Sequence, residues 1–296
     1  MSLADYRVKA TAAGGSIRAI AARTTSTALS VQMAHQASFV AAAALGRLLP
    51  ATSLLAADFK DDFRLTLTLE GDGPLGRVVS EIRTGGFLRA RAEHPRVDLP
   101  LRSDGKLAVG QAVGHKGILR VARQEFQHPP YEGQSPLVSG EIGEDLAHYY
   151  RVSEQIPAAV GLGVLIGTEG TVVSSGGLVI QALPGHQERT ADLITEKFQS
   201  MNNISWRLSQ GETPEDLLEA LLPSPIQWSD PEPLSYQCQC SREGSLEIIE
   251  SLPEADLDAL IQENGAEVVC HFCNTAYPIS LAELEWVRSV RTHSKS

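Results

Sequence analysis

Strand-like and helix-like stretches follow one another along the first part of the chain, up to about residue 183. Over residues 64–69 leucine stands at every second position between polar residues, which is typical of a strand with one solvent-facing side. Further strands are predicted at 117–123, 160–166 and 177–182. Residues 17–22 form a short apolar run.

Two stretches of the same region carry apolar residues at helical spacing. The first covers 33–55 and is rich in alanine and leucine, and we expect Pro50 to break its helix. The second covers 141–154. Together these elements predict an α+β fold, with a sheet-and-helix domain at 1–183 whose sheet is largely antiparallel.

The pattern changes from Pro184 onward. Apolar residues at helical intervals predict a helix over 188–208, and Thr213-Pro214-Glu215-Asp216 caps a second, short helix. Several prolines between 223 and 233 then predict a stiff polar connection. We therefore predict a helical linker at 184–230, which is metastable because its apolar faces depend on neighbouring parts of the chain.

The remaining residues, 231–296, carry the signals of a small domain. Ser251-Leu252-Pro253-Glu254 has the pattern of a capping box that opens a helix, and Gly265 stands where this helix would end. Val268-Val269 predicts a short strand, and a second box, Ser280-Leu281-Ala282-Glu283, predicts a further helix. At about sixty residues, an apolar core alone gives only marginal stability.

The chain has four cysteines, and all lie in this last domain, as Cys238-Gln239-Cys240 and Cys270-His271-Phe272-Cys273. Two close pairs of thiols at this separation are typical of one four-thiolate metal site. We predict one zinc ion per chain, held by Cys238, Cys240, Cys270 and Cys273. Four thiolates fill a tetrahedral shell, so His271 is not expected to be a ligand. In so small a domain, metal binding and folding should be one event.

The four-thiolate site leaves two roles open. A zinc ion that only holds the small domain together would suit a constitutive protein-interaction module with a purely structural site. The Cys-x-Cys pair, however, would close a very small and strained ring on oxidation, so its thiols should react only with a strong oxidant. A sensor of oxidative stress needs this property.

Composition and the absence of long apolar runs narrow the class of protein. A length of 296 residues with 43% hydrophobic residues predicts an ordinary globular chain of two domains. No run approaches the twenty apolar residues that span a membrane, so no membrane partner is expected. The start, Met1-Ser2-Leu3-Ala4-Asp5-Tyr6, lacks a basic region followed by an apolar segment, and we expect a cytoplasmic protein without a secretory signal. Thiols that are kept as metal ligands agree with that location.

The charge of the chain argues against nucleic acid as a partner. The formal net charge is −11, from 36 acidic and 25 basic residues. Zinc domains that bind nucleic acid normally present a basic face, whereas acidic residues outnumber basic ones after residue 231.

Two motifs in the first domain resemble nucleotide-binding sequences but have simpler structural explanations. Gly71-Asp72-Gly73-Pro74-Leu75-Gly76 matches the dinucleotide fingerprint, but no parallel βαβ unit follows it, and we interpret its glycines as turn-forming. The segment from Gly110 to Gly117 lacks the Lys-Ser/Thr ending of a phosphate loop. Neither motif predicts a nucleotide site.

No catalytic constellation stands out. Glu141, Glu144, Asp145 and His148 share a helical face, but acidic residues also favour the first turn of a helix through its dipole, and we prefer that explanation. A metal-dependent enzyme would need an open coordination position, which four thiolates do not leave. We predict that the chain is not an enzyme.

An ordered set of short motifs resembles a known family. They are Gly71-Asp72-Gly73-Pro74-Leu75-Gly76, Leu137-Val138-Ser139-Gly140-Glu141-Ile142 with Glu144-Asp145-Leu146, Ser153-Glu154-Gln155, Val160-Gly161-Leu162-Gly163-Val164, Gly176-Gly177 and Leu183-Pro184-Gly185, followed by Cys-x-Cys and Cys-x-x-Cys. In this order they resemble the 33-kDa heat-shock protein family, which are bacterial redox-regulated holdase chaperones. The resemblance runs from Ala44-Leu45-Gly46-Arg47 to the cysteines, and the order makes it specific, since each segment alone is weak.

The resemblance implies a redox switch at the four matching positions. The reduced, zinc-bound form would be inactive as a chaperone. Oxidation would join Cys238 with Cys240 and Cys270 with Cys273, and the zinc would be lost. The cysteine domain and the linker would then lose structure, and the protein, as a homodimer, would bind unfolded or partly unfolded clients without ATP.

The apolar residues of the linker suggest where clients bind. Without a supporting neighbour, its helices would expose an adaptable apolar surface. We hypothesise that this region gates, and partly forms, the client site. The candidate residues are Leu193, Phe198, Met201, Leu217 and Leu221.

Overall fold

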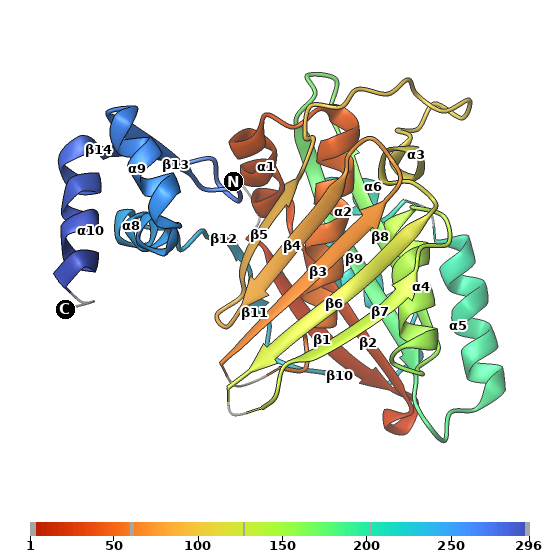
Figure 1. The fold of residues 1–296 in the computed structure, drawn as a ribbon. Helices are drawn as coiled ribbons and strands as arrows, with labels where there is room; N and C mark the ends of the chain where they lie inside the picture. Colours follow the sequence, from red (N-terminus) through yellow and green to blue (C-terminus); the bar gives the residue numbers. More distant parts are fainter. Residues whose placement is uncertain (1–3, 60–61, 127, 202, 294–296) are drawn as a thin grey trace. The chain divides into compact units, whose positions relative to one another are not determined.

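The computed structural model describes residues 4–59, 62–126, 128–201 and 203–293 (Figure 1). The chain divides into two compact units, Met1–Gln237 and Cys238–Ser296. Both contain helices and sheets, so the α+β fold is confirmed, with the four cysteines in the small C-terminal unit. The finer division into 1–183, 184–230 and 231–296 stays a prediction.

One sheet of the first unit is antiparallel throughout, with strand order β10-β1-β2-β9-β8 and with β11 also paired to β1. Its strands are β1 (Tyr6–Ala12), β2 (Ile17–Arg23), β8 (Ala158–Ile166), β9 (Val172–Ala182), β10 (Gln227–Trp228) and β11 (Glu232–Pro233). A short 3₁₀ turn, Ala13–Gly15, joins β1 to β2, and its two glycines adopt the positive φ that this tight connection requires. The predicted strands at 160–166 and 177–182 are confirmed, and the apolar run at 17–22 forms β2.

The second sheet has the order β12-β5-β4-β3-β6-β7. Its strands are β3 (Phe63–Gly71), β4 (Arg77–Arg83), β5 (Phe87–Ala92), β6 (Gly117–Glu125), β7 (Tyr131–Pro136) and β12 (Ser235–Tyr236). Neighbours are antiparallel, except that β12 pairs with β5 in parallel. Leu65, Leu67 and Leu69 are buried while the threonines between them are half-exposed, as the alternating pattern predicted.

Helix α2 (Phe39–Leu55) packs against both sheets and forms the centre of the main core. The other helices of this part are α1 (Thr25–His35), α3 (Val109–Val113) and α4 (Ile142–Val152). The prediction of one helix over 33–55 was wrong, because α1 ends where Gln36 takes a left-handed conformation and Ser38 caps a new helix. The helix predicted at 141–154 is confirmed as α4.

Pro50 lies inside α2 and does not break it, contrary to our expectation. A proline has no N–H, so the carbonyl oxygen of Gly46, four residues earlier, loses its helical partner. The buried Ser175 hydroxyl on β9 donates to this oxygen at 2.7 Å. Thr24 Oγ1 lies 2.8 Å from the same hydroxyl. The tertiary structure therefore replaces the bond that the proline removes.

The linker helices lie on the face of the first sheet opposite α2. They are α5 (Glu188–Ser200), α6 (Ile204–Ser209) and α7 (Pro214–Glu219). A second apolar cluster joins them to this sheet, with Val8, Ala10 and Leu178 on the strands and Leu208 and Leu217 on the helices among its buried members. The apolar faces of the linker thus rest on the sheet.

The single helix predicted over 188–208 is two helices. Met201 is extended, and Asn203 has a positive φ and accepts a bond from the Trp206 amide at its side chain, which starts α6. An asparagine tolerates this left-handed conformation and caps a helix well, so the break has a local cause. The capping box at Thr213 and Asp216 is confirmed at the start of α7.

The proline-rich stretch is more regular than expected. It contains β10 and β11, which pair with β1, and leads to β12, which pairs with β5. The sequence showed no strand pattern here because each strand has only two residues.

The second unit is a small helical domain with one hairpin. Its elements are α8 (Arg242–Ser251), α9 (Glu254–Gln262), β13 (Gly265–Val269), β14 (Ala276–Ser280) and α10 (Leu281–His293). Its core consists of Ile249, Leu257, Ile279, Leu284 and Val287.

One of the two capping boxes predicted for this unit is confirmed. The Ser280 amide and hydroxyl both donate to Glu283, at 2.8 and 2.6 Å, at the start of α10. The box at Ser251 was wrong, because Ser251 is the last residue of α8 and its hydroxyl donates to the Ile248 carbonyl at 2.7 Å. Helix α9 begins after Pro253 without a side-chain cap.

Candidate metal centre

The two cysteine pairs come from two different kinds of segment. Cys238 and Cys240 lie in the irregular stretch between β12 and α8, and Cys270 and Cys273 lie in the turn between β13 and β14. The Cys270 amide donates to the Thr275 carbonyl at 3.0 Å, and the Asn274 amide donates to the Cys270 carbonyl at 2.8 Å. Asn274 has a positive φ of 56°, which asparagine accepts readily. The hairpin thus presents both thiols of its turn on one side.

The four sulfur atoms form one tight group. All Sγ atoms lie within 4.8 Å of one another, and each residue is half-buried and outside any disulfide. The Sγ atoms of Cys238 and Cys270 are 3.6 Å apart, and those of Cys240 and Cys273 are 3.3 Å apart. A tetrahedral zinc site with Zn–S bonds of about 2.3 Å has sulfur atoms about 3.8 Å apart. The arrangement therefore fits a four-coordinate metal ion.

Neighbouring groups shift the pKa values of Cys240, Cys270 and Cys273 in different directions. Burial, together with the adjacent thiols, raises the pKa of Cys240 to about 12, although the Tyr277 hydroxyl donates to its sulfur at 3.2 Å. Burial also raises the pKa of Cys270, against the amides of Phe272 and Cys273, which lower it. For Cys273 burial acts in the same direction, but hydrogen bonds with the hydroxyl and amide of Thr275 and with the thiols of Cys240 and Cys270 outweigh it and lower the pKa to about 7.

These pKa shifts bear on how the four thiols could bind a metal ion. Metal ligands are thiolates, and buried thiolates so close together repel one another. A bound cation would remove that penalty, and its binding would release protons. The donor set, the distances and the burial all suit a soft divalent ion. Tyr277 and Thr275, which contact the sulfur atoms of Cys240 and Cys273, were not among the predicted site residues.

His271 lies between the two cysteines of the turn but is exposed and not part of the group. Within the described ranges, the cysteine quartet is the cluster of potential ligands close enough together to hold a metal ion. This agrees with the expectation that the histidine is not a ligand.

The carboxylate and imidazole candidates on α4 serve the local structure instead. Glu141 pairs with Arg47 and with Arg102. Asp145 is buried and accepts from the amides of Val138 and Ser139 at 2.7 and 3.1 Å. His148 Nδ1 lies 2.9 Å from the Arg151 guanidinium. Glu141, Asp145 and His148 thus have separate partners.

The glycine motif at 71–76 forms the turn between the antiparallel strands β3 and β4. Its Gly73 and Leu75 amides donate to the carbonyls of Val113 and Ala112, each at 3.0 Å. The turn-forming interpretation is confirmed.

The five candidate client-binding residues differ in exposure. Leu193 is exposed, Phe198 and Met201 are half-buried, and Leu217 and Leu221 are buried in the cluster between the linker and the first sheet. Phe198 and Met201 also line a cavity of about 780 Å³ together with residues of β8. The structure therefore does not gather the five on one open surface.

Comparison with known proteins decides the family. The family model described as "Hsp33 protein" matches residues 5–280. The 33 kDa chaperonins of Staphylococcus aureus strains Newman and USA300 are 41% identical over 282 residues, which cover 95% of this chain and 96% of each relative. The chain belongs to the Hsp33 family.

A solved structure of an Hsp33 relative supports the same assignment. The crystal structure of the 33 kDa chaperonin from Thermotoga maritima matches with a TM-score of 0.89 and 32% identity, covering 97% of this chain and 99% of that one. Hsp33 names describe chaperones rather than enzymes, and membership gives the chain a chaperone role with client proteins as partners. No helix in the described part of the chain has the length and apolar character needed to cross a membrane.

Proposed function

We propose that this Hsp33 protein is a redox-regulated, ATP-independent holdase that binds unfolding proteins under oxidative stress in the cytoplasm. The observation that carries the proposal is the quartet of free thiols, whose four sulfur atoms lie within 4.8 Å of one another. They belong to a unit whose core has few fully buried side chains. The chemical state of four atoms can therefore control the folding of that unit.

Zinc is the metal we propose for the site, one ion per chain. Cys238, Cys240, Cys270 and Cys273 would hold it as thiolates, and it would cross-link the strand turn to the segment before α8. A structural zinc of this kind contributes on the order of 10 kcal/mol of apparent binding energy to folding. Reduced, metal-bound protein is the inactive form.

Oxidation removes the ligands. We propose that Cys238 joins Cys240 and that Cys270 joins Cys273. Each disulfide forms when two thiols lose two electrons and two protons, which one molecule of peroxide takes up to give two molecules of water. Two disulfides leave no thiolate to hold the metal, and the small unit then lacks its main support.

The linker transmits this change in our proposal. Residues 184–230 would be metastable between a core domain at 1–183 and a redox domain at 231–296. Much of the linker's apolar contact is to the first sheet. When it loosens, Leu193, Phe198, Met201, Leu217 and Leu221 would become available to clients, and the active species would be a homodimer.

Hydrogen exchange on reduced and on peroxide- or hypochlorite-treated protein tests the mechanism, with the disulfides mapped in the same samples by mass spectrometry. The proposal expects lower protection over 188–222 and over the cysteine unit after oxidation, while α2 and the strands around it stay protected. Equal protection of the linker in both states would contradict it. If the protein suppresses aggregation equally well when reduced, the metal is purely structural and the protein acts constitutively.

A further inference from the structure

A short segment of the chain occupies the edge of the first sheet. Residues 227–233, here called the strap, run antiparallel to β1, with Trp228 opposite Ala10 and Glu232 opposite Arg7. Between these pairs, the Ser229 amide donates to the Lys9 carbonyl at 2.9 Å. Without the strap, β1 would be an unpaired edge strand, because its other side is fully paired with β2.

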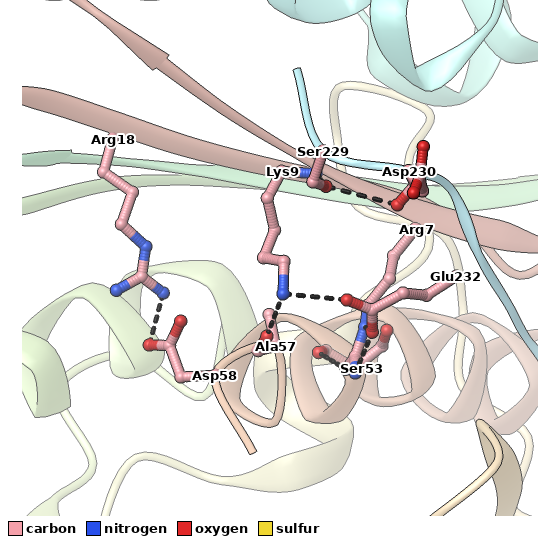
Figure 2. Close-up of polar contacts among 9 residues, drawn as sticks. All are labelled: Arg7, Lys9, Arg18, Ser53, Ala57, Asp58, Ser229, Asp230 and Glu232. Atoms are coloured by element: carbon pink, nitrogen blue, oxygen red, sulfur yellow. Dashed lines mark hydrogen bonds and ion pairs between the residues drawn. The ribbon is translucent and has the colours of Figure 1, made fainter. Parts of the chain in front are cut away.

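One carboxylate anchors the strap (Figure 2). The side chain of Glu232 accepts from Arg7 Nε and Nη2, at 2.8 and 2.6 Å, and pairs with Lys9 Nζ at 2.8 Å. Arg7 is almost completely buried, with 4% of its side chain exposed. The guanidinium therefore needs an anionic partner at this position, because a buried and uncompensated charge is costly.

The two cations are held in place independently of the strap. Arg7 Nη1 donates to the Ser53 carbonyl at 2.7 Å, and Lys9 Nζ donates to the Ala57 carbonyl at 2.8 Å. The Ser53 carbonyl lies in the last turn of α2 and the Ala57 carbonyl just after its C-cap, near the end of the helix whose dipole favours positive charge. A pocket for a carboxylate thus lies beside the β1 backbone groups that would become free for an extended peptide if the strap left.

Apart from the Glu232 anchor, the strap has little backbone pairing. It contributes two ladders of two residue pairs each, β10 and β11, which are interrupted between Trp228 and Glu232. Only Leu234-Ser235-Tyr236-Gln237 separates its end from Cys238. If the cysteine unit loses structure, the change therefore starts only four intervening residues from the end of the strap.

We propose that the edge of β1 is a binding site for extended client segments that carry a carboxylate side chain, and that the strap fills this site in the resting protein. The client would add a strand to the sheet through backbone hydrogen bonds, and its Asp or Glu would take the place of Glu232 between Arg7 and Lys9. Main-chain pairing accepts many sequences, whereas the carboxylate fixes the register. The inference rests on the proposed holdase function and names the kind of segment that one of its sites takes.

A labelled peptide with the strap's own sequence, Ile226 to Leu234, is the probe. Fluorescence anisotropy should show that it binds the oxidised full-length chain, and that the same peptide with glutamine in place of its Glu232 binds about tenfold more weakly, as expected for loss of a charged hydrogen bond. Binding should also weaken as salt is added, because two cations hold the carboxylate. Equal binding of the two peptides would overturn the inference.

Protein variants locate the site. Lys9→Gln should weaken binding of the native peptide and leave binding of the glutamine peptide nearly unchanged. Arg18→Gln is the matched control, because Arg18 is a cation on the neighbouring strand β2 that pairs with Asp58 rather than with Glu232 (Figure 2). If both variants weaken the native peptide equally, the attraction is not specific to the pocket, and the proposed site is wrong.

A second variant separates this inference from the holdase proposal. Glu232→Gln in the full-length chain weakens the strap without any oxidation, so the reduced variant should bind the native peptide at least tenfold more tightly than the reduced wild type does. Binding there would support the site even if oxidation never activates the protein. Oxidised protein that suppresses aggregation but ignores both peptides would overturn the site and leave the holdase proposal standing. Dimers formed by exchange of straps, with the peptide excluded, would make a second copy of the chain the occupant and would also overturn it.

Discussion

Four thiols and the few groups that touch them set the chemistry of the C-terminal unit. Their sulfur atoms are close enough for one metal ion, and burial disfavours the thiolates that such an ion requires. The thiols therefore act as a group, because the loss of one leaves the others without a complete coordination shell.

Replacement of one thiol should abolish metal binding. Cys240→Ser removes a ligand, and because even changes to groups around ligands cost 10–100-fold in affinity, we expect a loss of more than about hundredfold. Zinc titration of the reduced protein with a chromogenic chelator measures it. His271→Gln is the control, since His271 lies within the same turn but outside the sulfur group. An unchanged affinity in the cysteine variant would contradict the four-thiolate site.

The Ser175 hydroxyl offers a test of the bond that replaces the one lost at Pro50. Ser175→Ala leaves the Gly46 carbonyl unpaired and buried, so it should lower the free energy of unfolding by about 1–3 kcal/mol. In a Pro50→Ala background the new amide can serve that carbonyl, and the same serine change should then cost less. A double-mutant cycle from denaturant unfolding measures the difference. Costs that simply add would show that the two positions are not coupled.

The residue types and their spacing predicted the four cysteines that cluster, but not the residues that surround them. Cysteine spacing alone predicted which four thiols meet, because metal ligands follow a small set of spacings. Tyr277 on β14 contacts Cys240 in the segment before α8, and Glu232 contacts Arg7 over 225 positions of sequence. Such contacts depend on which strands pair, and no local pattern encodes that.

Among the elements, α6 packs closely on β8 and β9 of the first sheet. Glycines on β8 and β9 bring the sheet backbone close to the linker, and at Gly163 an added Cβ would lie 2.8 Å from the Ser205 amide nitrogen. The Ser174 hydroxyl on β9 donates to the Ser205 carbonyl at 2.5 Å. The contact is thus close, polar and intolerant of added atoms.

Gly163→Ala should loosen α6 without touching the cysteines. The new methyl group meets backbone, so the helix must shift. We expect faster hydrogen exchange over 188–222 and partial suppression of client aggregation by the reduced, zinc-loaded protein. Gly143→Ala is the control, because its nearest neighbour would lie 3.8 Å away, an ordinary contact. A reduced Gly163→Ala protein with a loosened linker and no chaperone activity would argue against gating by the linker.

Local patterns predicted these elements well where the signal is local and failed where the tertiary structure intervenes. The strand at 64–69 and the boxes at Thr213 and Ser280 follow from side-chain alternation and capping chemistry. Pro50 stays helical only because Ser175 supplies a partner from a distant strand. The strap has no strand pattern because its register comes from β1 and not from its own residues.

In the molecule as a whole, stability is distributed unequally between the two units. Among the described residues, the unit Met1–Gln237 holds two extensive apolar clusters, whereas the unit Cys238–Ser296 has a small cluster and the four cysteines. A unit of that size would draw much of its stability from a bound metal ion, whereas the larger unit has its apolar core.

Removal of the metal should therefore unfold one unit and spare the other. Under reducing conditions with a strong zinc chelator, we expect α8, α9, α10 and the β13–β14 hairpin to lose protection against hydrogen exchange, while α2 and the strands around it keep theirs. Return of zinc should restore the protection. A cysteine unit that stays protected without metal would contradict a fold that depends on it.

Suppression of client aggregation is the property that, in the proposed mechanism, depends on the thiols, on the linker and on client binding together. We would follow a heat-unfolding model protein by light scattering in the presence of reduced, zinc-loaded protein or of the same sample treated with peroxide or hypochlorite, and record zinc release in parallel. We predict suppression only after oxidation, in proportion to the zinc released. Equal suppression by the reduced protein, or none by either form, would contradict a redox-controlled holdase.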